Sequence, residues 1–293
     1  MKLQSVLTIL DKPKHPQTAL ARTRRLVKES GARVHLLSFC WSRLAESDGV
    51  FARDQDRAIK QAMIVERRDW LISQIVDIPE LERARTSVLW SKDIAGSIAG
   101  MAARNDADLL VKSIHQSGTL LHTPLDWALL RTSTIPVLLT TTRRRKQSGI
   151  VLAAVDVTRQ DRAHQRLNRR VLDAAHTMAT LERAKVHVVA VAELPNALID
   201  LDILDKREAQ LRARLHIENG LNELLEPYDL PKSQRHIPIG KVGQSVNVIA
   251  HQINADLLVV GTHAHRLKQI VGIGNSAEKI VARAKCDVLA VKP

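Results

Sequence analysis

The stretch Asp256-Leu-Leu-Val-Val-Gly-Thr-His263 decides the fold, because a near copy of it stands half a chain earlier. The earlier copy reads Asp108-Leu-Leu-Val-Lys-Ser-Ile-His115. In both copies a short apolar run follows a stretch of helical character, as expected for a strand buried on both faces of a parallel sheet. Self-similarity over this distance indicates a duplicated structural unit.

Two further pairs of segments extend the duplication. Val6–Asp11 resembles Val151–Asp156, and Ile135–Leu139 resembles Cys286–Ala290. The segment over residues 140–149 is polar and charged, as linkers are. We therefore expect two domains, and we place the boundary inside this segment.

The predicted fold class is α/β, with two tandem Rossmann-like domains over residues 1–142 and 143–293. Each is expected to hold a five-stranded parallel sheet with helices on both faces. Strands are predicted near residues 6–10, 34–39, 87–90, 109–114, 137–140, 150–155, 186–191, 234–239, 257–261 and 288–292. Helices are predicted near residues 16–30, 50–76, 93–105, 124–132, 160–182, 201–226, 243–254 and 276–284.

Composition limits the class of protein. The chain has 293 residues, which suits two domains, and only two cysteines, Cys40 and Cys286, which do not indicate a disulfide framework. No apolar run reaches the length of a membrane span. The first residues lead directly into a strand-like segment, so no signal peptide is predicted. We expect a cytoplasmic protein of bacterial type.

The net charge of +13 has two interpretations. It indicates either a solvated basic surface or an anionic partner. The chain contains four Trp, one Tyr and two Phe residues, which argues against recognition of RNA or single strands by base stacking. Nucleic acid is therefore not the expected main partner.

A glycine pattern follows the fourth strand of the second unit. It reads Gly261-Thr-His-Ala264, nine residues, and then Gly274-Asn275-Ser276. This pattern, with Ala277–Ile280 after it, resembles the universal stress protein family. In the first unit, Val111–Gln116 and Thr123–Trp127 resemble the tandem-domain E-type members of that family.

The resemblance implies a fold like that of the adenine nucleotide alpha hydrolases and a bound ATP or other phosphate-bearing ligand in the second unit. Glycine-rich loops and helix N-termini present backbone N–H groups to phosphates. The ligand-binding residues carried over from the family are Asp156, Val191, Ala192, Gly261, Ala264, Gly274, Asn275 and Ser276.

Two departures from the pattern leave other interpretations open. Ala264 stands where the family has a second glycine, and Asn275 stands where it has Ser or Thr. Asn275-Ser-Ala-Glu278 also fits a capping sequence that would satisfy the helix donors without a ligand.

The first unit departs further. Ser113 replaces the equivalent of Gly261, and Thr123-Pro-Leu-Asp126 forms a capping box. Asp126 would place a negative charge where a phosphate would lie. We interpret the first unit as degenerate, with a structural or partner-binding role.

Two other groups of residues are weaker signals. Arg159, Arg162, Arg166, Arg169 and Arg170 share one helical face, opposite Leu167, Val171, Ala174 and Met178. This arginine stripe is either solvated or faces an anion. His263 and His265 are more typical of a loop surface than of a metal site, and we predict no metal ligand.

No spacing indicates a catalytic residue, so we do not predict an enzyme, although weak ATPase activity stays open. The sequence favours a stress-response protein that binds a small anionic ligand. The alternative is an interaction or regulatory module without a nucleotide, acting through protein or nucleic-acid partners. The short linker predicts that the two units pair within the chain, and a homodimer of the whole chain is left open.

Overall fold

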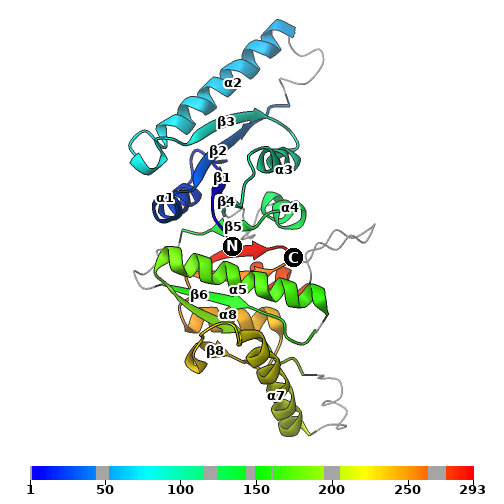
Figure 1. The fold of residues 1–293 in the computed structure, drawn as a ribbon. Helices are drawn as coiled ribbons and strands as arrows, with labels where there is room; N and C mark the ends of the chain where they lie inside the picture. Colours follow the sequence, from blue (N-terminus) through cyan, green and yellow to red (C-terminus); the bar gives the residue numbers. More distant parts are fainter. Residues whose placement is uncertain are drawn as a thin grey trace. The chain divides into compact units, whose positions relative to one another are not determined.

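The computed structural model describes residues 2–43, 53–114, 124–142, 149–159, 161–194, 205–262 and 275–293. Contacts divide the chain into two compact units, one over residues 2–142 and the other over residues 143–293. Each unit is a parallel sheet with helices on both sides (Figure 1). The α/β class predicted from the apolar runs is confirmed.

The first unit holds five strands in the order β3-β2-β1-β4-β5, all of them parallel. The strands are β1 (Ser5–Ile9), β2 (Arg33–Cys40), β3 (Arg85–Trp90), β4 (Leu109–Ser113) and β5 (Val137–Thr140). The helices are α1 (Thr18–Ser30), α2 (Arg53–Ser73), α3 (Ile94–Arg104) and α4 (Pro124–Thr132), and a short 3-10 turn, η2 (Pro79–Leu81), precedes β3. Helix α1 lies on one face of the sheet, and α3 and α4 lie on the other (Figure 1).

The second unit repeats this order as β8-β7-β6-β9-β10, again all parallel. Its strands are β6 (Ile150–Ala154), β7 (Lys185–Val189), β8 (Arg235–His236), β9 (Leu257–Gly261) and β10 (Asp287–Val291). Its helices are α5 (Arg162–Glu182), α7 (Lys206–Leu225), α8 (Val242–Gln252) and α9 (Asn275–Val281), with a 3-10 turn, η3 (Lys232–Gln234), before β8.

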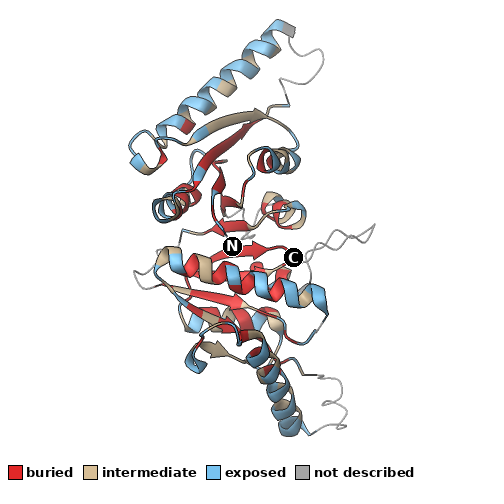
Figure 2. Ribbon diagram, in the orientation of Figure 1, coloured by how far each residue is buried: buried red, intermediate tan, exposed pale blue. Residues whose placement is uncertain are grey.

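The central strands are the core of each unit. All residues of β1, β4, β5 and β10 are buried, because helices cover both faces of the sheet (Figure 2). On one face of the first sheet, Leu20 of α1 and Leu71 of α2 join Leu36 of β2 in one apolar cluster. Continuous apolar runs in the sequence therefore mark strands that are buried on both sides.

One predicted strand is shorter than expected. Residues 234–239 were predicted as a strand, yet β8 spans only Arg235–His236, and Ile239 forms an isolated bridge with Ala192. Pro238 lies between them, and proline has no backbone N–H to donate to a ladder. Proline therefore interrupts the strand.

The strand order identifies, in each unit, the edge at which other open α/β sheets bind ligands. In both sheets the order reverses between the first and fourth strands, β1 and β4 or β6 and β9. Ligands of open α/β sheets bind beyond the carboxyl ends of the strands at such a switch point. Asp11 and Ser113 lie there in the first unit, and Asp156 and Gly261 lie there in the second.

Candidate functional site

Asp156 follows β6 at the switch point of the second unit and is exposed. Its Oδ1 accepts hydrogen bonds from the backbone N–H and the hydroxyl of Thr158, at 3.0 and 2.5 Å. The backbone of Asp156 is held by Asn168 of α5, whose side chain donates to the Asp156 carbonyl at 2.7 Å and accepts from its N–H at 3.1 Å. A fixed backbone thus presents an exposed carboxylate at the edge of the sheet.

Val191 and Ala192, the second predicted group, are buried. Ala192 donates its N–H to the Pro238 carbonyl at 2.9 Å, and its carbonyl accepts from the N–H of Gly240 at 3.0 Å. Their role in ligand contact stays a prediction. The structure shows Ala192 as part of the connection that continues β7 toward Ile239.

Gly261 ends β9, and packing explains why it has no side chain. A Cβ atom built at this position would lie 2.7 Å from Cγ and Cδ2 of Leu167, a buried residue of α5. The equivalent position in the first unit is Ser113, whose hydroxyl accepts from the N–H of Ala19 in α1 at 2.9 Å. In the second unit, the large side chain of Leu167 on α5 therefore packs against Gly261. In the first unit, α1 approaches Ser113 at a small residue, Ala19.

The remaining predicted residues are described only in part. Ala264 and Gly274 lie outside the described residues, as do His263 and His265. Helix α9 begins at Asn275, one residue before the predicted start, so Asn275 is a helical residue rather than the cap. Ser276 is exposed in the first turn of this helix.

The switch point of the first unit contains a group of charges that the sequence analysis missed. Lys112 of β4 is completely buried, and its Nζ lies 3.0 Å from Oδ2 of Asp11 and 2.9 Å from Oδ1 of Asp126. Asp126, in the first turn of α4, is also completely buried. The signal was a lysine inside the apolar run Leu109–Ser113, where a buried charge needs a partner.

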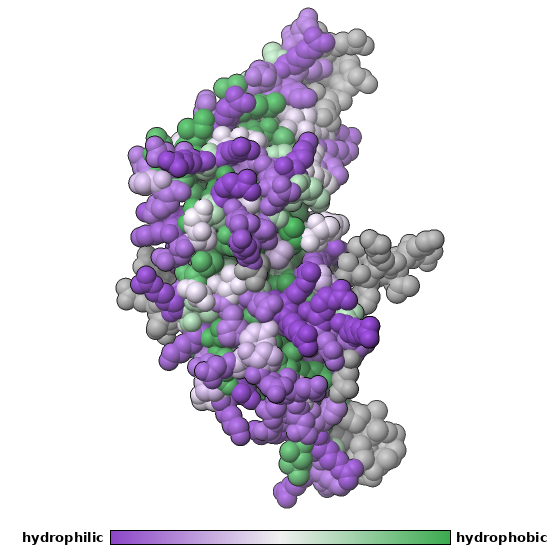
Figure 3. Space-filling view, viewed as in Figure 1, coloured by the Kyte–Doolittle hydropathy of each residue, from purple (hydrophilic) through white to green (hydrophobic). Residues whose placement is uncertain are grey.

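The arginine stripe of α5 lies on an exposed surface. Arg162, Arg166, Arg169 and Arg170 are exposed, whereas Leu167, Val171, Ala174 and Met178 are buried as predicted. The part of the surface around α5 that Figure 3 shows is strongly hydrophilic. Arg159 precedes the helix, and the guanidinium of Arg170 donates to the Lys292 carbonyl at 3.2 Å.

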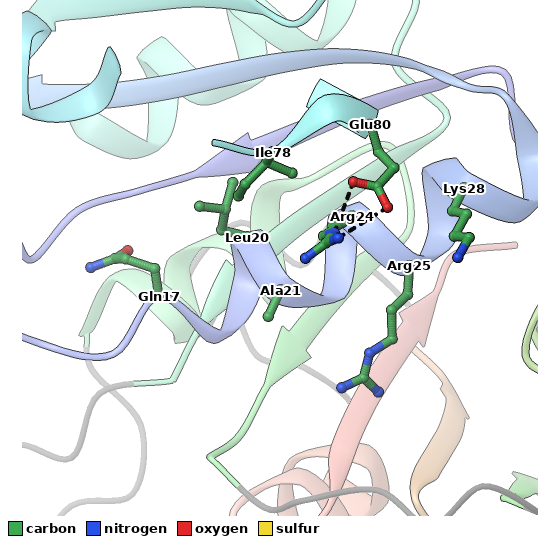
Figure 4. Close-up of a pocket in the computed structure, with 8 residues that line it drawn as sticks. All are labelled: Gln17, Leu20, Ala21, Arg24, Arg25, Lys28, Ile78 and Glu80. Carbon is green, nitrogen blue, oxygen red and sulfur yellow. Dashed lines mark hydrogen bonds and ion pairs between the residues drawn. The ribbon is translucent and has the colours of Figure 1, made fainter. Parts of the chain in front are cut away.

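A groove on the first unit lies along α1, apart from the switch point (Figure 4). Arg24 and Glu80 form a two-point ion pair there, with N–O distances of 2.9 and 3.2 Å. The hydrogen bond from Arg24 lowers the pKa of Glu80. Arg25 and Lys28 also line the groove, with Gln17, Leu20, Ala21 and Ile78.

The described ranges contain no candidate metal centre and no candidate membrane span. Within them, no three His, Cys, Asp or Glu residues gather as metal ligands. No helix in these ranges is long and apolar enough to cross a membrane.

Comparisons with known proteins agree with the duplicated fold. The model of the universal stress protein family matches residues 2–141 and again residues 149–292. The chain is 26% identical over 316 residues to the universal stress protein E homolog of Haemophilus influenzae, covering 100% of this chain and 98% of that protein. It is 23% identical over 301 residues to universal stress protein E of Escherichia coli K12, covering 99% and 94%.

Solved structures show the same fold. A crystal structure from Pseudomonas aeruginosa matches with a TM-score of 0.73 and 24% identity, covering 99% of this chain and 94% of the other. A universal stress protein from Archaeoglobus fulgidus matches with a TM-score of 0.65 and 15% identity, covering 98% of each chain.

Proposed function

Because this chain belongs to the universal stress protein family and carries two of its domains, we propose that it is a stress-response protein that binds a nucleotide or another phosphate-bearing anion in its second domain. The contrast between the two switch points carries the proposal. Asp156 is exposed beyond β6, whereas its counterpart Asp11 forms an ion pair with the buried Lys112.

The chemistry of the second domain suits such a ligand. An exposed carboxylate accepts hydrogen bonds from hydroxyl groups, so Asp156 suits the sugar of a nucleotide. Asn168 holds the backbone of Asp156 and therefore orients that carboxylate. The resemblance assigns the phosphates to the segment over residues 261–276, and the exposed Ser276 would provide a further polar group.

A second candidate function is an interaction or regulatory module that binds no nucleotide. The packing of Gly261 against Leu167 favours it, because packing requires this glycine of the family pattern whether or not a ligand binds. The exposed arginines of α5 would then face a protein or nucleic-acid partner. Pairing of the two units, a homodimer and a cytoplasmic location remain proposals.

Calorimetric titration with magnesium ATP tests the proposal. Asp156→Asn removes the negative charge at the switch point, and we expect the Kd to rise about tenfold, which corresponds to about 1.4 kcal/mol. Asp229→Asn is the matched control, because Asp229 is also an exposed aspartate of the second domain. Equal binding by both variants, or no binding by the unmodified protein, would favour the second candidate function.

A further inference from the structure

Lys112 is a buried cation in the middle of the first sheet. It lies on β4, paired in register with Ile9 of β1, and its side chain is fully shielded from solvent. Moving an ammonium group out of water is strongly unfavourable unless other groups replace the lost water contacts. The surroundings of Lys112 therefore have to provide both charge and hydrogen-bond acceptors.

Three acceptors surround the ammonium group. Nζ lies 3.0 Å from Oδ2 of Asp11, 2.9 Å from Oδ1 of Asp126, and 2.9 Å from the carbonyl oxygen of Ser113, to which it donates. A lysine ammonium has three N–H donors and no acceptor. One hydrogen bond to a carbonyl and two close carboxylates thus replace the water that the buried ammonium group has lost. We call Asp11, Lys112 and Asp126 the ion triad.

The ion triad lies at the switch point of the first unit. Asp11 follows β1, Lys112 lies on the neighbouring strand β4, and Asp126 is the third residue of α4. This is the edge at which open α/β sheets bind ligands.

The second unit has replaced two of the three members. Val260 stands at the position of Lys112, because Ala154 pairs with Val260 where Ile9 pairs with Lys112. Ala277, the third residue of α9, stands at the position of Asp126. Only the aspartate is kept, as Asp156, and it is exposed.

We propose that the ion triad fills the ligand position of the first unit, so that this unit is closed to phosphate-bearing ligands and is held together by its own lysine. Asp126 places a carboxylate in the first turn of α4, where the helix N-terminus would otherwise face an anion, and this carboxylate repels a phosphate. That the second unit is open to ligands rests on the proposed function. That the ion triad stabilises the first unit, which we call the lock, does not depend on it.

A double-mutant cycle tests the lock. Lys112→Val and Asp126→Ala introduce the residues of the second unit, singly and together. All four tryptophans, Trp41, Trp70, Trp90 and Trp127, belong to the first unit, so tryptophan fluorescence during denaturant unfolding reports that unit.

We expect Lys112→Val alone to lower the denaturation midpoint most, because it leaves the completely buried Asp126 without its cation. Adding Asp126→Ala should raise the midpoint again, since one buried carboxylate is removed. If Lys112→Val does not fold, recovery of the folded fluorescence signal in the double variant is the readout. A double variant that is as unstable as the sum of the single losses, or that does not fold, would overturn the lock.

Photo-crosslinking with an azido-ATP probe, followed by peptide mapping of the full chain, tests the closure separately. We expect labelled peptides only from the second unit in the unmodified protein. Labelled peptides from the first unit would overturn the closure. Absence of label from both units would instead count against the proposed function, and the double-mutant cycle would still decide the lock.

Discussion

Gly261 shows how a single residue of a binding motif can be fixed by packing. A methyl group at this position would enter the space of the buried Leu167. Overpacking of a well-filled core costs about 1–3 kcal/mol. The glycine would therefore be needed at the end of β9 even in a protein that had no ligand.

Gly261→Ala is expected to lower the free energy of unfolding by about 1–3 kcal/mol. In the Leu167→Ala background, the loss caused by Gly261→Ala should be smaller, because the opposing side chain is gone. Thermal unfolding followed by circular dichroism measures both.

Gly100→Ala is the control for this substitution. A Cβ there would meet only Nη2 of Arg104 at 3.5 Å, an ordinary contact in the interior of α3. We expect this change to stabilise the protein by about 0.5–1 kcal/mol, because glycine is a poor helix former. A Gly261→Ala variant as stable as the Gly100→Ala variant would refute the packing argument.

The sequence alone predicted some of these residues and not others. Aspartates at strand ends can be found from the pattern, because apolar runs identify the strands. The role of Lys112 could not be found, because its partners Asp11 and Asp126 are distant in sequence and only the fold brings them together. Asp126 was expected to place a negative charge where a phosphate would lie, and its burial beside Lys112 could not be read from the sequence.

At the scale of elements, a pair of histidines joins the edge strand β8 to β7. It has two residues, and His236 on it lies 2.9 Å from His187 of β7, measured between Nε2 and Nδ1. Their rings stack with centroids 5.2 Å apart. In the first unit the corresponding His35 instead contacts the hydroxyl of Ser87 on β3 at 2.9 Å.

The histidine pair predicts a loss of stability in acid. Burial lowers the pKa of His187, and the charges of His236 and Lys185 lower it further; burial also lowers the pKa of His236. The unfolded chain, with ordinary pKa values near 6.5, then binds protons more readily than the folded chain. Above this pH the two histidines do not change the free energy of unfolding with pH. Stability falls as the pH drops below about 6.5 toward the lower pKa values of the folded chain.

His236→Ser, which introduces the residue of the first unit, should flatten this pH dependence between about pH 7 and 5. Circular dichroism melting at several pH values measures it. Part of the pH dependence should remain in this variant, because burial also lowers the pKa of His176. A variant as sensitive to acid as the unmodified protein would show that the pair is not responsible.

Helices and strands were predicted with small boundary errors, and one of these errors has a clear local cause. Pro238 shortens the predicted edge strand, and helix α9 begins at Asn275, one residue before the predicted start. Periodicity identifies which elements exist, whereas individual backbone donors decide where they end.

At the scale of the whole molecule, duplication predicted the architecture most reliably. The two halves repeat one strand order, although their switch points differ in charge and exposure. A repeated apolar pattern specifies the sheet, because every copy must bury the same strands. It does not specify the chemistry at the carboxyl ends, where single substitutions change the partners.

The ion triad also restricts how the first unit can evolve. Replacing Lys112 alone removes the ammonium group that lies beside the buried carboxylate of Asp126. Replacing Asp126 alone removes one of the two carboxylates that balance the buried ammonium group. Each single step toward the residues of the second unit therefore passes through a less stable protein. The pairing of this lysine with this aspartate therefore makes the difference between the two units hard to reverse by one mutation at a time.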